Sequence, residues 1–402
     1  MQTLLKEKRI LVGVTGSIAI YKTLELVRMF VKAGAIVRVI MSEEAKRFIT
    51  PLTFEAISQN RVLHVETESW ADDNNHIHIG KWADIFVIAP ISANTINKLS
   101  CGIADNLLTQ IALAYPKKIL IAPSANTYMI LNPITLESME KLKGLGFYIC
   151  ETQKKLLACN DEGVGAMAEP REIFFKTASL LLEDAFWTKR NVVITGGGSR
   201  EKIDDVRCLT NFSSGKMANY IAQALYLKGA NVTLITSATT NELPQEINIL
   251  HVETTQNYLN AIETTLQDAS YEKTPYLFMA GAISDFVVAN PQKGKIKKES
   301  CGDTMTLELC KNIDILKTLD KKNIKTIGFK AEMDASSALE SAKKMLIEKN
   351  LDAVCLNIIG EENHFGKEHN AITFITKNST TTVPMAHKFS ISLVLSELTK
   401  TL

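Results

Sequence analysis

Long apolar runs, an excess of charge of one sign and a signal peptide are all missing from this sequence. No apolar run reaches the roughly 18 residues that a membrane-spanning helix needs, and the segment MQTLLKEKRILVGVTG lacks the apolar core of a signal peptide. The 45 basic and 44 acidic residues leave a net charge of +1, which gives no electrostatic reason to expect a nucleic acid or a membrane as partner. We therefore expect a cytoplasmic protein with small-molecule ligands.

The sequence also lacks paired cysteines and a dinucleotide-binding fingerprint. Its seven cysteines are scattered without a Cys-x-x-Cys pair, which argues for reduced thiols and against a disulfide framework or a zinc site. Neither half has a Gly-x-Gly-x-x-Gly turn with an acidic residue about 20 positions later, so an NAD-dependent dehydrogenase is disfavoured.

The sequence contains the pattern of a βαβ unit twice, once at the start of each half. Residues 9–40 and 191–236 each start with a β-branched run, break at a glycine-rich turn, form an amphipathic helix that ends near a Gly-Ala pair, and close with an apolar run. Because 402 residues are too many for one ordinary core, we predict an α/β protein of two Rossmann-like domains. A polar joint at residues 188–190 places these domains at residues 1–189 and 190–402.

Alternating apolar and helical segments predict a parallel sheet with helices on both faces in each half. Strands are predicted in the first half at 10–15, 36–41, 85–90, 118–122 and 147–149, with a closing helix at 171–187. In the second half they are predicted at 191–195, 231–236, 276–280, 325–329, 353–357 and 371–375, with helices at 216–228, 256–268 and 336–349. Ligands of such sheets bind at the carboxyl ends of the strands, where polar residues follow in the first half: Gly13–Ala19, Ser42, Pro90–Thr95 and Pro123–Asn126.

The turn at residues 13–19 suits a phosphate. Backbone N–H groups and the helix dipole favour an anion there, and Thr15 or Ser17 can add a hydroxyl donor. Because the third glycine of a dinucleotide turn is missing and Tyr21-Lys22 is not a P-loop pair, a mononucleotide fits better than NAD. The alternative is a compact strand–helix connection without a ligand.

A second polar cluster follows the third strand, at residues 89–98 and 102–108. Polar side chains this dense after a buried strand need partners, and a planar heterocycle with hydrogen-bonding edges would supply them. The alternative is an N-cap role for Ser92 and Asn94 on the following helix.

The motifs GVTGSIA, PISANT and ADNLL and the segment 75–84 resemble the flavin-dependent cysteine decarboxylases, which share the fold of phosphopantothenoylcysteine decarboxylase. The resemblance implies a flavodoxin-like domain that binds FMN and uses His76 as a catalytic residue, whereas His78 falls on a variable position. It implies FMN contacts from the following residues: Gly16, Ser17, Ile18, Ala19, Ser42, Ser92, Ala93, Asn94, Thr95, Ala104, Asp105 and Asn106.

The segment ACNDEGVGAM resembles the flap that covers the substrate in this family. The resemblance implies that Cys159 returns a proton to the enethiolate product and that Asn126 binds the substrate carboxylate. A lid that excludes water suits such chemistry. The sequence departs from the family at Ala125, Asn160 and Ala166, where Met, Gly and Arg are usual, which leaves open an enzyme that ligates but decarboxylates poorly.

The second half resembles phosphopantothenate–cysteine ligase through the signature at Asn211–Met217. The hydroxyls of Ser213 and Ser214 and the amide of Gly215, at a helix start, make an anion cradle. The resemblance implies that Asn211 is a catalytic residue and contacts an acyl-nucleotide intermediate.

Further segments of the second half match the same family: MAGAISDF, KIKK, KNIDIL and GFKAE. The resemblance implies that Asp285 contacts the nucleotide or its Mg²⁺ and that Lys295 binds phosphate from a flexible loop, although a lysine run is more commonly solvated surface. Lys344 is expected to replace, through a one-residue shift, a lysine that is missing at Met345. The remaining implied CTP contacts are Met279, Ala280, Gly281, Ile313, Asp314, Ile315, Leu316, Phe329 and Lys349.

The resemblance runs through the whole chain, decarboxylase first and ligase second, as in the bifunctional enzymes of bacterial coenzyme A biosynthesis. It implies 4′-phosphopantothenate, L-cysteine and CTP as substrates, FMN and Mg²⁺ as cofactors, and 4′-phosphopantetheine as product. It also implies a homo-oligomer with trimeric decarboxylase and dimeric ligase contacts, which a dodecamer would satisfy. The alternative from another class is a flavodoxin-like regulatory protein without catalysis, which His76 and Cys159 disfavour.

Overall fold

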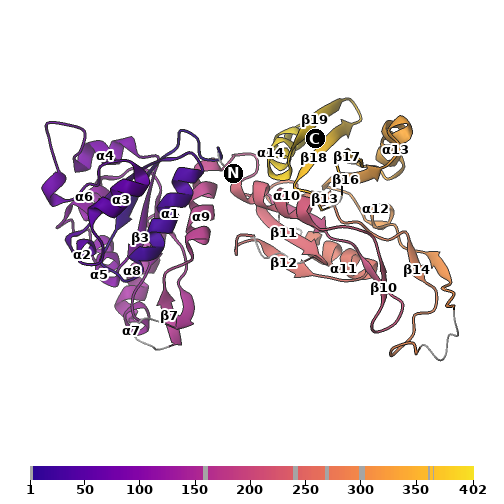
Figure 1. Cartoon of the computed structure of the whole chain (residues 1–402), viewed down its shortest axis with the longest axis horizontal. Helices are drawn as coiled ribbons and strands as arrows, with labels where there is room; N and C mark the ends of the chain where they lie inside the picture. The colour runs from indigo at the N-terminus through magenta and orange to yellow at the C-terminus, as the bar shows by residue number, and fades with distance from the viewer. Residues whose placement is uncertain are drawn as a thin grey trace. The chain divides into compact units, whose positions relative to one another are not determined.

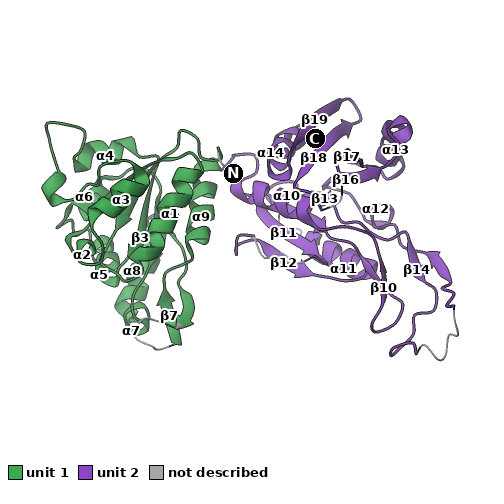
Figure 2. Cartoon of the chain, in the orientation of Figure 1, with its two compact units in different colours: residues 1–182 green, residues 183–402 purple. Residues whose placement is uncertain are grey.

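The structure, a computed structural model, divides the chain into two units, residues 1–182 and residues 183–402 (Figure 2). Each unit is α/β and has its own buried core, so the predicted fold class is confirmed. None of the described helices is long and apolar enough to cross a membrane. The structure describes residues 3–156, 162–238, 243–267, 271–297, 304–360, 363–364 and 366–402.

Unit 1 contains a five-stranded parallel sheet in the order β2-β1-β3-β4-β5 (Figure 1). Its strands are β1 (Arg9–Val14), β2 (Ile36–Met41), β3 (Ile85–Ile91), β4 (Ile119–Pro123) and β5 (Tyr148–Ile149). Its helices are α1 (Ile20–Lys32), α2 (Glu43–Lys46), α3 (Pro51–Ser58), η1 (Val65–Thr67), α4 (His76–Trp82), α5 (Ala93–Ser100), α6 (Leu107–Ala114), α7 (Thr127–Ile130), α8 (Pro133–Gly144) and α9 (Pro170–Leu182).

The strands of unit 1 are apolar because helices cover both faces of the sheet. Every residue of β3 is buried. On one face α4, α5, α6 and α8 share a core with β1, β3 and β4. Elsewhere in the unit α1 packs on α9 through Phe30 and Phe174, whose ring centroids lie 5.6 Å apart. Each of the five predicted strands is present within one residue of its predicted bounds.

An antiparallel hairpin, β6 (Gln153–Leu156) and β7 (Glu162–Ala166), lies between β5 and α9 along the chain. Its strands are short and were not predicted. The flap segment expected from the sequence begins in the connection between them and continues along β7.

Unit 2 contains an eight-stranded sheet in the order β12-β11-β8-β13-β16-β17-β18-β19. The strands from β12 to β17 pair in parallel, whereas β18 and β19 extend the sheet antiparallel. The sheet strands are β8 (Asn191–Gly196), β11 (Asn231–Thr236), β12 (Asn248–His251), β13 (Tyr276–Met279), β16 (Lys325–Glu332), β17 (Ala353–Ile358), β18 (His369–Thr376) and β19 (Thr380–His387).

Two small antiparallel pairs accompany this sheet, β9 (Arg200–Lys202) with β10 (Cys208–Thr210) and β14 (Phe286–Val288) with β15 (Leu309–Lys311). The helices of unit 2 are α10 (Lys216–Leu227), α11 (Thr255–Leu266), α12 (Ile315–Thr318), α13 (Ala335–Glu348), α14 (Lys388–Leu398) and η3 (Thr399–Thr401). The two pairs, β12, β19, α12 and α14 were not predicted from the sequence.

The closing helix of unit 1 was predicted too long, because α9 ends at Leu182. The residues after it belong to unit 2, where Trp187 is fully buried and donates from Nε1 to the Ser396 carbonyl oxygen at 2.9 Å. Its ring packs edge-on against Tyr276, with centroids 5.0 Å apart. The last residues of the predicted helix are therefore part of the second unit, and a domain border at 189/190 stays a prediction.

Candidate functional site

The loops after β1, β3 and β4 meet at the carboxyl edge of the unit 1 sheet. The Thr15 hydroxyl donates to the Pro90 carbonyl oxygen at 2.9 Å and accepts from the Ser92 amide at 2.9 Å. The Ser17 hydroxyl donates to the Ser124 hydroxyl at 3.0 Å. Three loops that lie far apart in the sequence are thereby tied into one surface, at the edge where parallel α/β sheets bind ligands.

Helix α1 begins at this edge without a side-chain cap. Its N-cap residue, Ala19, makes no capping hydrogen bond through a side chain, and its first turn holds no acidic residue. Backbone N–H groups at such a start, together with the helix dipole, favour a phosphate. The neighbouring side chains of Ile18 and Tyr21 are 59% and 64% exposed, and they offer apolar surface beside the phosphate position. This arrangement fits the predicted mononucleotide cofactor.

The other residues predicted to bind the cofactor lie in the loops and helix starts that follow β1, β2 and β3 and in the loop before α6. Several of them cap a helix. Ser42 caps α2, Ser92 caps α5 and Asn106 caps α6, so the N-cap alternative describes the Ser92 side chain correctly. Asp105 forms an ion pair with Lys98 at 2.5 Å, and the hydrogen bond from that lysine lowers the pKa of Asp105. The remaining predicted residues, which also come from these loops and helix starts, are Gly16, Ala93, Asn94, Thr95 and Ala104.

Strand β7 packs directly on the loop between β4 and α7. Two glycines allow this approach: a Cβ atom on Gly163 would lie 2.0 Å from the Thr127 Oγ1 atom, and one on Gly165 would lie 2.2 Å from the Ala125 carbonyl oxygen. The Ala125 amide donates to the Gly165 carbonyl oxygen at 3.1 Å. Asn126 follows in this loop, half-buried, so the described part of the flap lies against the loop that carries the predicted carboxylate-binding residue.

Ion pairs hold the base of this hairpin. Lys22 on α1 contacts Glu169 at 2.9 Å, and Lys155 on β6 pairs with the same carboxylate. Burial raises the pKa of Glu169, but the two lysines outweigh burial and hold that pKa below its usual value. The tip of the flap, with Cys159 and Asn160, lies outside the described residues.

His76 is the first residue of α4, and its Nδ1 atom lies 2.6 Å from Glu68 Oε1. Because α4 leads within two residues into the start of β3, its C-terminal end lies at the amino edge of the sheet. His76 lies at the other end of this helix, away from the start of β3. His78 is exposed and lies 3.6 Å from Asp73.

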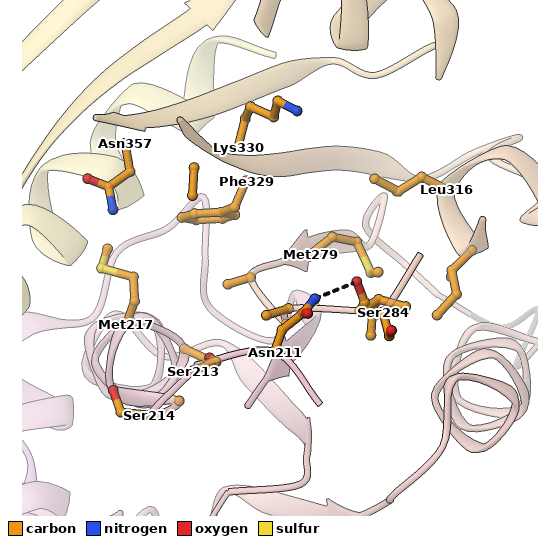
Figure 3. Close-up of a pocket in the computed structure, with 18 of the residues that line it drawn as sticks. Asn211, Ser213, Ser214, Met217, Met279, Ser284, Leu316, Phe329, Lys330 and Asn357 are labelled. Carbon is orange, nitrogen blue, oxygen red and sulfur yellow. Dashed lines mark hydrogen bonds between the residues drawn. The ribbon is translucent and has the colours of Figure 1, made fainter. Parts of the chain in front are cut away.

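Unit 2 holds a cavity of about 400 Å³ near the carboxyl ends of β13, β16 and β17 (Figure 3). It is the meeting point of segments that are separated by more than a hundred residues in the chain. Most of the predicted ligase residues line it: Asn211, Ser213, Ser214, Gly215, Met279, Ala280, Gly281, Asp285, Ile313, Asp314, Ile315, Leu316, Phe329 and Lys349.

Helix α10 begins at this cavity with the same uncapped start as α1. Its N-cap residue, Gly215, has a φ of 71° and makes no side-chain cap, and the first turn holds no acidic residue. A Cβ atom on Gly215 would lie 2.7 Å from the Ala238 Cβ atom, so the tight turn requires glycine. At the cavity wall the Asn211 Nδ2 atom donates to the Ile283 carbonyl oxygen at 3.2 Å, which sets the direction of the amide (Figure 3).

The charged lining of the cavity is largely paired. Three ion pairs include a lysine that lines it: Lys216 with Glu368, Lys330 with Glu332 at 3.2 Å, and Lys349 with Asp314 at 3.0 Å. Lys388 is 7% exposed and burial lowers the pKa of its ammonium.

Among the described residues no cluster of three or more His, Cys, Asp or Glu side chains could hold a metal ion, and Asp285 is exposed at the cavity wall.

Sequence reasoning missed the part of the lining that comes from the C-terminal segments. Asn357, near the end of β17, lies on the same side of the cavity as Met217 and Phe329 (Figure 3). The one available signal was a polar residue at the end of the apolar run AVCLN. Other lining residues that were not predicted include Lys216, Asn312, Lys330, Met345, Asn363, His364, Asn370 and Lys388.

Two predicted nucleotide-binding lysines do not line the cavity. The Lys344 side chain is 71% exposed and lies 3.8 Å from Glu348, whereas Met345, the next residue of α13, lines the cavity. Lys295 is exposed in the segment after β14 and is also absent from the lining. The roles of both lysines toward the nucleotide stay predictions.

The turn at residues 204–207 anchors the lysine segment at residues 292–297. The Asp204 carboxylate accepts from the Ile296 amide at 3.1 Å, and the Asp205 carboxylate accepts from the Gly294 amide at 2.7 Å. These two bonds hold the backbone on either side of Lys295.

Asp204 is well suited to this task because its carboxylate is buried and fully hydrogen-bonded. It also accepts from the amides of Val206 and Arg207 at 2.7 and 2.6 Å and from the Arg207 guanidinium at 2.9 Å. Burial raises the pKa of Asp204, but these donors outweigh burial and hold it below its usual value. The carboxylate is therefore charged at neutral pH, and the anchor is intact there.

Comparisons with known proteins match both units. The family model described as "Flavoprotein" matches residues 1–182, and the model described as "DNA/pantothenate metabolism flavoprotein C-terminal domain" matches residues 187–401. Among solved structures, the C-terminal domain of the coenzyme A biosynthesis bifunctional protein CoaBC is 28% identical and covers 54% of this chain and 97% of that chain, with a TM-score of 0.44. The FMN binding protein AtHal3 is 36% identical over 43% of this chain and 95% of that chain, with a TM-score of 0.38.

Curated relatives match nearly the whole chain, and three of them carry the description coenzyme A biosynthesis bifunctional protein CoaBC. The relative from Haemophilus influenzae is 38% identical and covers 93% of this chain and 92% of that protein. The relative from Borreliella burgdorferi is 34% identical, with 96% and 97% covered, and that from Bacillus subtilis is 34% identical, with 98% and 97% covered.

The family models define the class of the protein. Its first unit is a flavoprotein domain, and its second unit is the C-terminal domain of the DNA/pantothenate metabolism flavoproteins. Within that class the near full-length relatives are decisive: the chain belongs to the CoaBC family of bifunctional coenzyme A biosynthesis enzymes. The recognition made from the motifs is thereby confirmed.

Removing the buried carboxylate of Asp204 should loosen the lysine segment. We expect trypsin to cut the Asp204→Ala protein after Lys293, Lys295 or Lys297 several-fold faster than it cuts the unchanged protein, because local opening exposes this backbone. Mass spectrometry of a digestion time course measures the rate. The matched control is Asp334→Ala, which removes another hydrogen-bonded carboxylate with a lowered pKa at the start of α13. Equal rates at residues 293–297 in both variants would contradict the anchor.

Proposed function

We propose that the chain joins 4′-phosphopantothenate to L-cysteine with CTP in unit 2, and decarboxylates the product to 4′-phosphopantetheine with FMN in unit 1. The observation that carries the proposal is the pair of uncapped helix starts, α1 and α10, at the carboxyl edges of two sheets in a member of the CoaBC family. Both starts favour phosphate, and both proposed reactions use phosphate-bearing ligands.

In the proposed ligation, the substrate carboxylate attacks the α-phosphorus of CTP, and pyrophosphate leaves. The cysteine amine then attacks the acyl carbon of the acyl-cytidylate, CMP leaves with the electron pair of the acyl–oxygen bond, and the amide loses a proton. The amides at the α10 start, with Ser213 and Ser214, hold phosphate oxygens, and Asn211 donates to the acyl phosphate as its negative charge develops. The cavity lining supports this, since these residues share one wall.

The triphosphate needs compensating charge as pyrophosphate leaves. Asp285 is proposed as a ligand of Mg²⁺, which commonly uses one or two carboxylates together with substrate phosphates. Lys349 lines the cavity and already pairs with Asp314, so it can exchange that partner for a phosphate oxygen. Lys295 on its anchored segment, and Lys344 on α13, are proposed to approach the nucleotide when it binds. Phe329 supplies an aromatic face for the cytosine base.

In the proposed decarboxylation, the residues at the carboxyl edge of unit 1 hold FMN. The fit rests on the donor set: an uncapped helix start for the phosphate, hydroxyls of Ser17 and Ser92, and exposed apolar side chains beside them. When bound, FMN supplies reversible acceptance of two electrons from the cysteinyl thiol, so that carbon dioxide can leave without net redox change.

Side chains of the protein transfer the protons and bind the substrate carboxylate in this proposed reaction. His76 moves the proton of the reacting thiol, Asn126 holds the substrate carboxylate before it is lost, and Cys159 returns a proton to the enethiolate. The close packing of β7 on the loop of Asn126 supports a flap that shuts water out during these steps.

The assembly and location proposed here rest on the family alone. We propose a cytoplasmic homo-oligomer with trimeric contacts between decarboxylase units and dimeric contacts between ligase units, which a dodecamer would satisfy. The substrates are proposed to be small molecules, with no nucleic-acid or membrane partner.

The proposed function is tested by an absorption spectrum followed by an assay of the complete sequence of reactions. We expect a yellow protein that converts phosphopantothenate, cysteine, CTP and Mg²⁺ into phosphopantetheine, detected by mass. Accumulation of phosphopantothenoylcysteine by a yellow protein would overturn the decarboxylase half and point to the changes at Ala125, Asn160 and Ala166. A colourless protein that makes neither product would overturn both halves.

Replacing Cys159 should separate the two activities. In Cys159→Ser we expect phosphopantetheine formation to fall by about a hundredfold or more, because the hydroxyl is a far weaker acid than the thiol, while CTP-dependent ligation is unchanged. Product masses from each substrate measure the two rates. Cys101→Ser, at an exposed free cysteine of the same unit, is the matched control and should decarboxylate normally. Near-normal decarboxylation by Cys159→Ser would refute the proton-donor role.

Replacing Lys295 should impair ligation alone. Lys295→Ala removes a cation proposed to stabilise the leaving pyrophosphate, and losses of about 10²–10³ in kcat are typical when such a donor is removed. Pyrophosphate release measures the effect, with decarboxylation of supplied phosphopantothenoylcysteine as the internal reference. The control is Lys293→Ala, two residues away in the same exposed segment. If both variants released pyrophosphate equally fast, the assignment of Lys295 would be wrong.

A further inference from the structure

The ring of His76 is held on two sides. Its Nδ1 atom lies 2.6 Å from the Glu68 Oε1 atom. The indole of Trp70 stands edge-on to it, with centroids 5.4 Å apart and planes at 89°. Among the described residues no hydrogen bond to the Nε2 atom of His76 is found. One nitrogen of the ring is therefore engaged and the other is available.

The segment that carries Glu68 is itself fixed to the start of α4. Asn75 is fully buried; its Oδ1 atom accepts from the His78 amide at 3.0 Å, and its Nδ2 atom donates to the Asp72 carbonyl oxygen at 3.2 Å. The Asn74 Nδ2 atom donates to the Thr67 carbonyl oxygen at 2.6 Å, directly before Glu68. Hydrogen bonds within residues 67–78 thus fix the position of the Glu68 carboxylate beside the imidazole.

The partner of Nδ1 decides which nitrogen of the imidazole carries the proton. An ionised carboxylate only accepts hydrogen bonds, so a contact of this length to Glu68 places the proton on Nδ1. The Nε2 atom then has a free lone pair and can accept a proton from a substrate. A carboxylate in this position also stabilises the imidazolium that forms, as in the hydrolase triads.

The other histidine–carboxylate pairs in the same region lack this combination. His64 contacts Glu66 at 2.5 Å, but that carboxylate is also held by Lys46 at 2.6 Å. His78 lies 3.6 Å from Asp73, which is 86% exposed. Among the described pairs of this segment, only His76 combines a close carboxylate of its own with a position at the first residue of α4.

We propose that Glu68 is a positioning residue for the decarboxylase reaction: it fixes the Nδ1–H tautomer of His76 and presents Nε2 as the base. This inference rests on the proposed function of unit 1. Glu68 itself touches neither substrate nor cofactor; it acts through the imidazole.

The first test is Glu68→Gln, which keeps the shape of the side chain and removes its charge. An amide can donate to Nδ1 and stabilise the wrong tautomer, so we expect kcat for decarboxylation of supplied phosphopantothenoylcysteine to fall about ten- to a hundredfold. The KM, the flavin absorbance and CTP-dependent ligation should stay within about twofold of the unchanged enzyme, since the amide keeps the shape of the side chain. The matched control is Asp73→Asn, at the exposed pair with His78, which should leave kcat unchanged.

The second test is chemical rescue, which a merely structural role would not permit. Glu68→Ala opens space beside Nδ1, and added formate should restore part of kcat whereas chloride at the same concentration should not. Wild-type kcat in Glu68→Gln, or loss of flavin in that variant, would overturn the inference, because the carboxylate would then be either unneeded or required by the fold. Failure of the unchanged enzyme to decarboxylate would instead contradict the proposed function of unit 1.

Discussion

Parallel pairing of the strands is the constraint on which both sites depend. Parallel neighbours bring their carboxyl ends to one edge, so every loop that follows a strand arrives at the same place. In unit 1 this joins Thr15 to Pro90 and Ser17 to Ser124 by hydrogen bonds across more than 70 residues of chain. In unit 2 the segments after the parallel strands β13 and β17 meet around one cavity, together with the start of α10. Without that shared edge, neither set of polar residues would meet.

The two units begin with the same βαβ pattern and differ in the elements that surround its helix start. In unit 1 the first helix starts without a side-chain cap, and β7 packs on the β4–α7 loop at contact distances that only glycine allows. In unit 2 the sheet is extended by β18 and β19, and α14 packs on α10. Lys216 on α10 is held by Glu368, whose second oxygen accepts from the Tyr220 hydroxyl at 2.8 Å, so the residue directly before β18 holds the start of α10.

The buried parts of both sheets could be predicted because a strand covered on both faces is apolar at every position, as IFVIAPI in β3 is. The pairs β9–β10 and β14–β15 have only three residues per strand, which is too short for any periodicity to show. Strand β19 is largely exposed and rich in threonine, and helix α14 places serines among its buried residues, so neither carries a clear apolar pattern.

Motif spacing could not predict which of two neighbouring residues on α13 faces the cavity. A step of one residue turns the side chain by about 100° around a helix, so Met345 faces the cavity while Lys344 points to Glu348. Motif spacing identifies the helix and leaves this rotation undetermined. Lys388 and Asn370 reach the cavity only because β18 and β19 pair antiparallel beside β17, a tertiary fact that local sequence does not encode.

Chain order and reaction order are opposite in the proposed function, since the second unit makes the substrate of the first. Sequence order therefore carries no information about the direction of flow. Each unit buries its own core, and the hydrogen bonds that position Glu68 lie wholly within unit 1 while those that position Lys295 lie wholly within unit 2. Substitutions at distant, independent sites have additive effects. The activity of the unchanged unit is consequently an internal reference for the amount of chain assayed when the other unit carries the substitution.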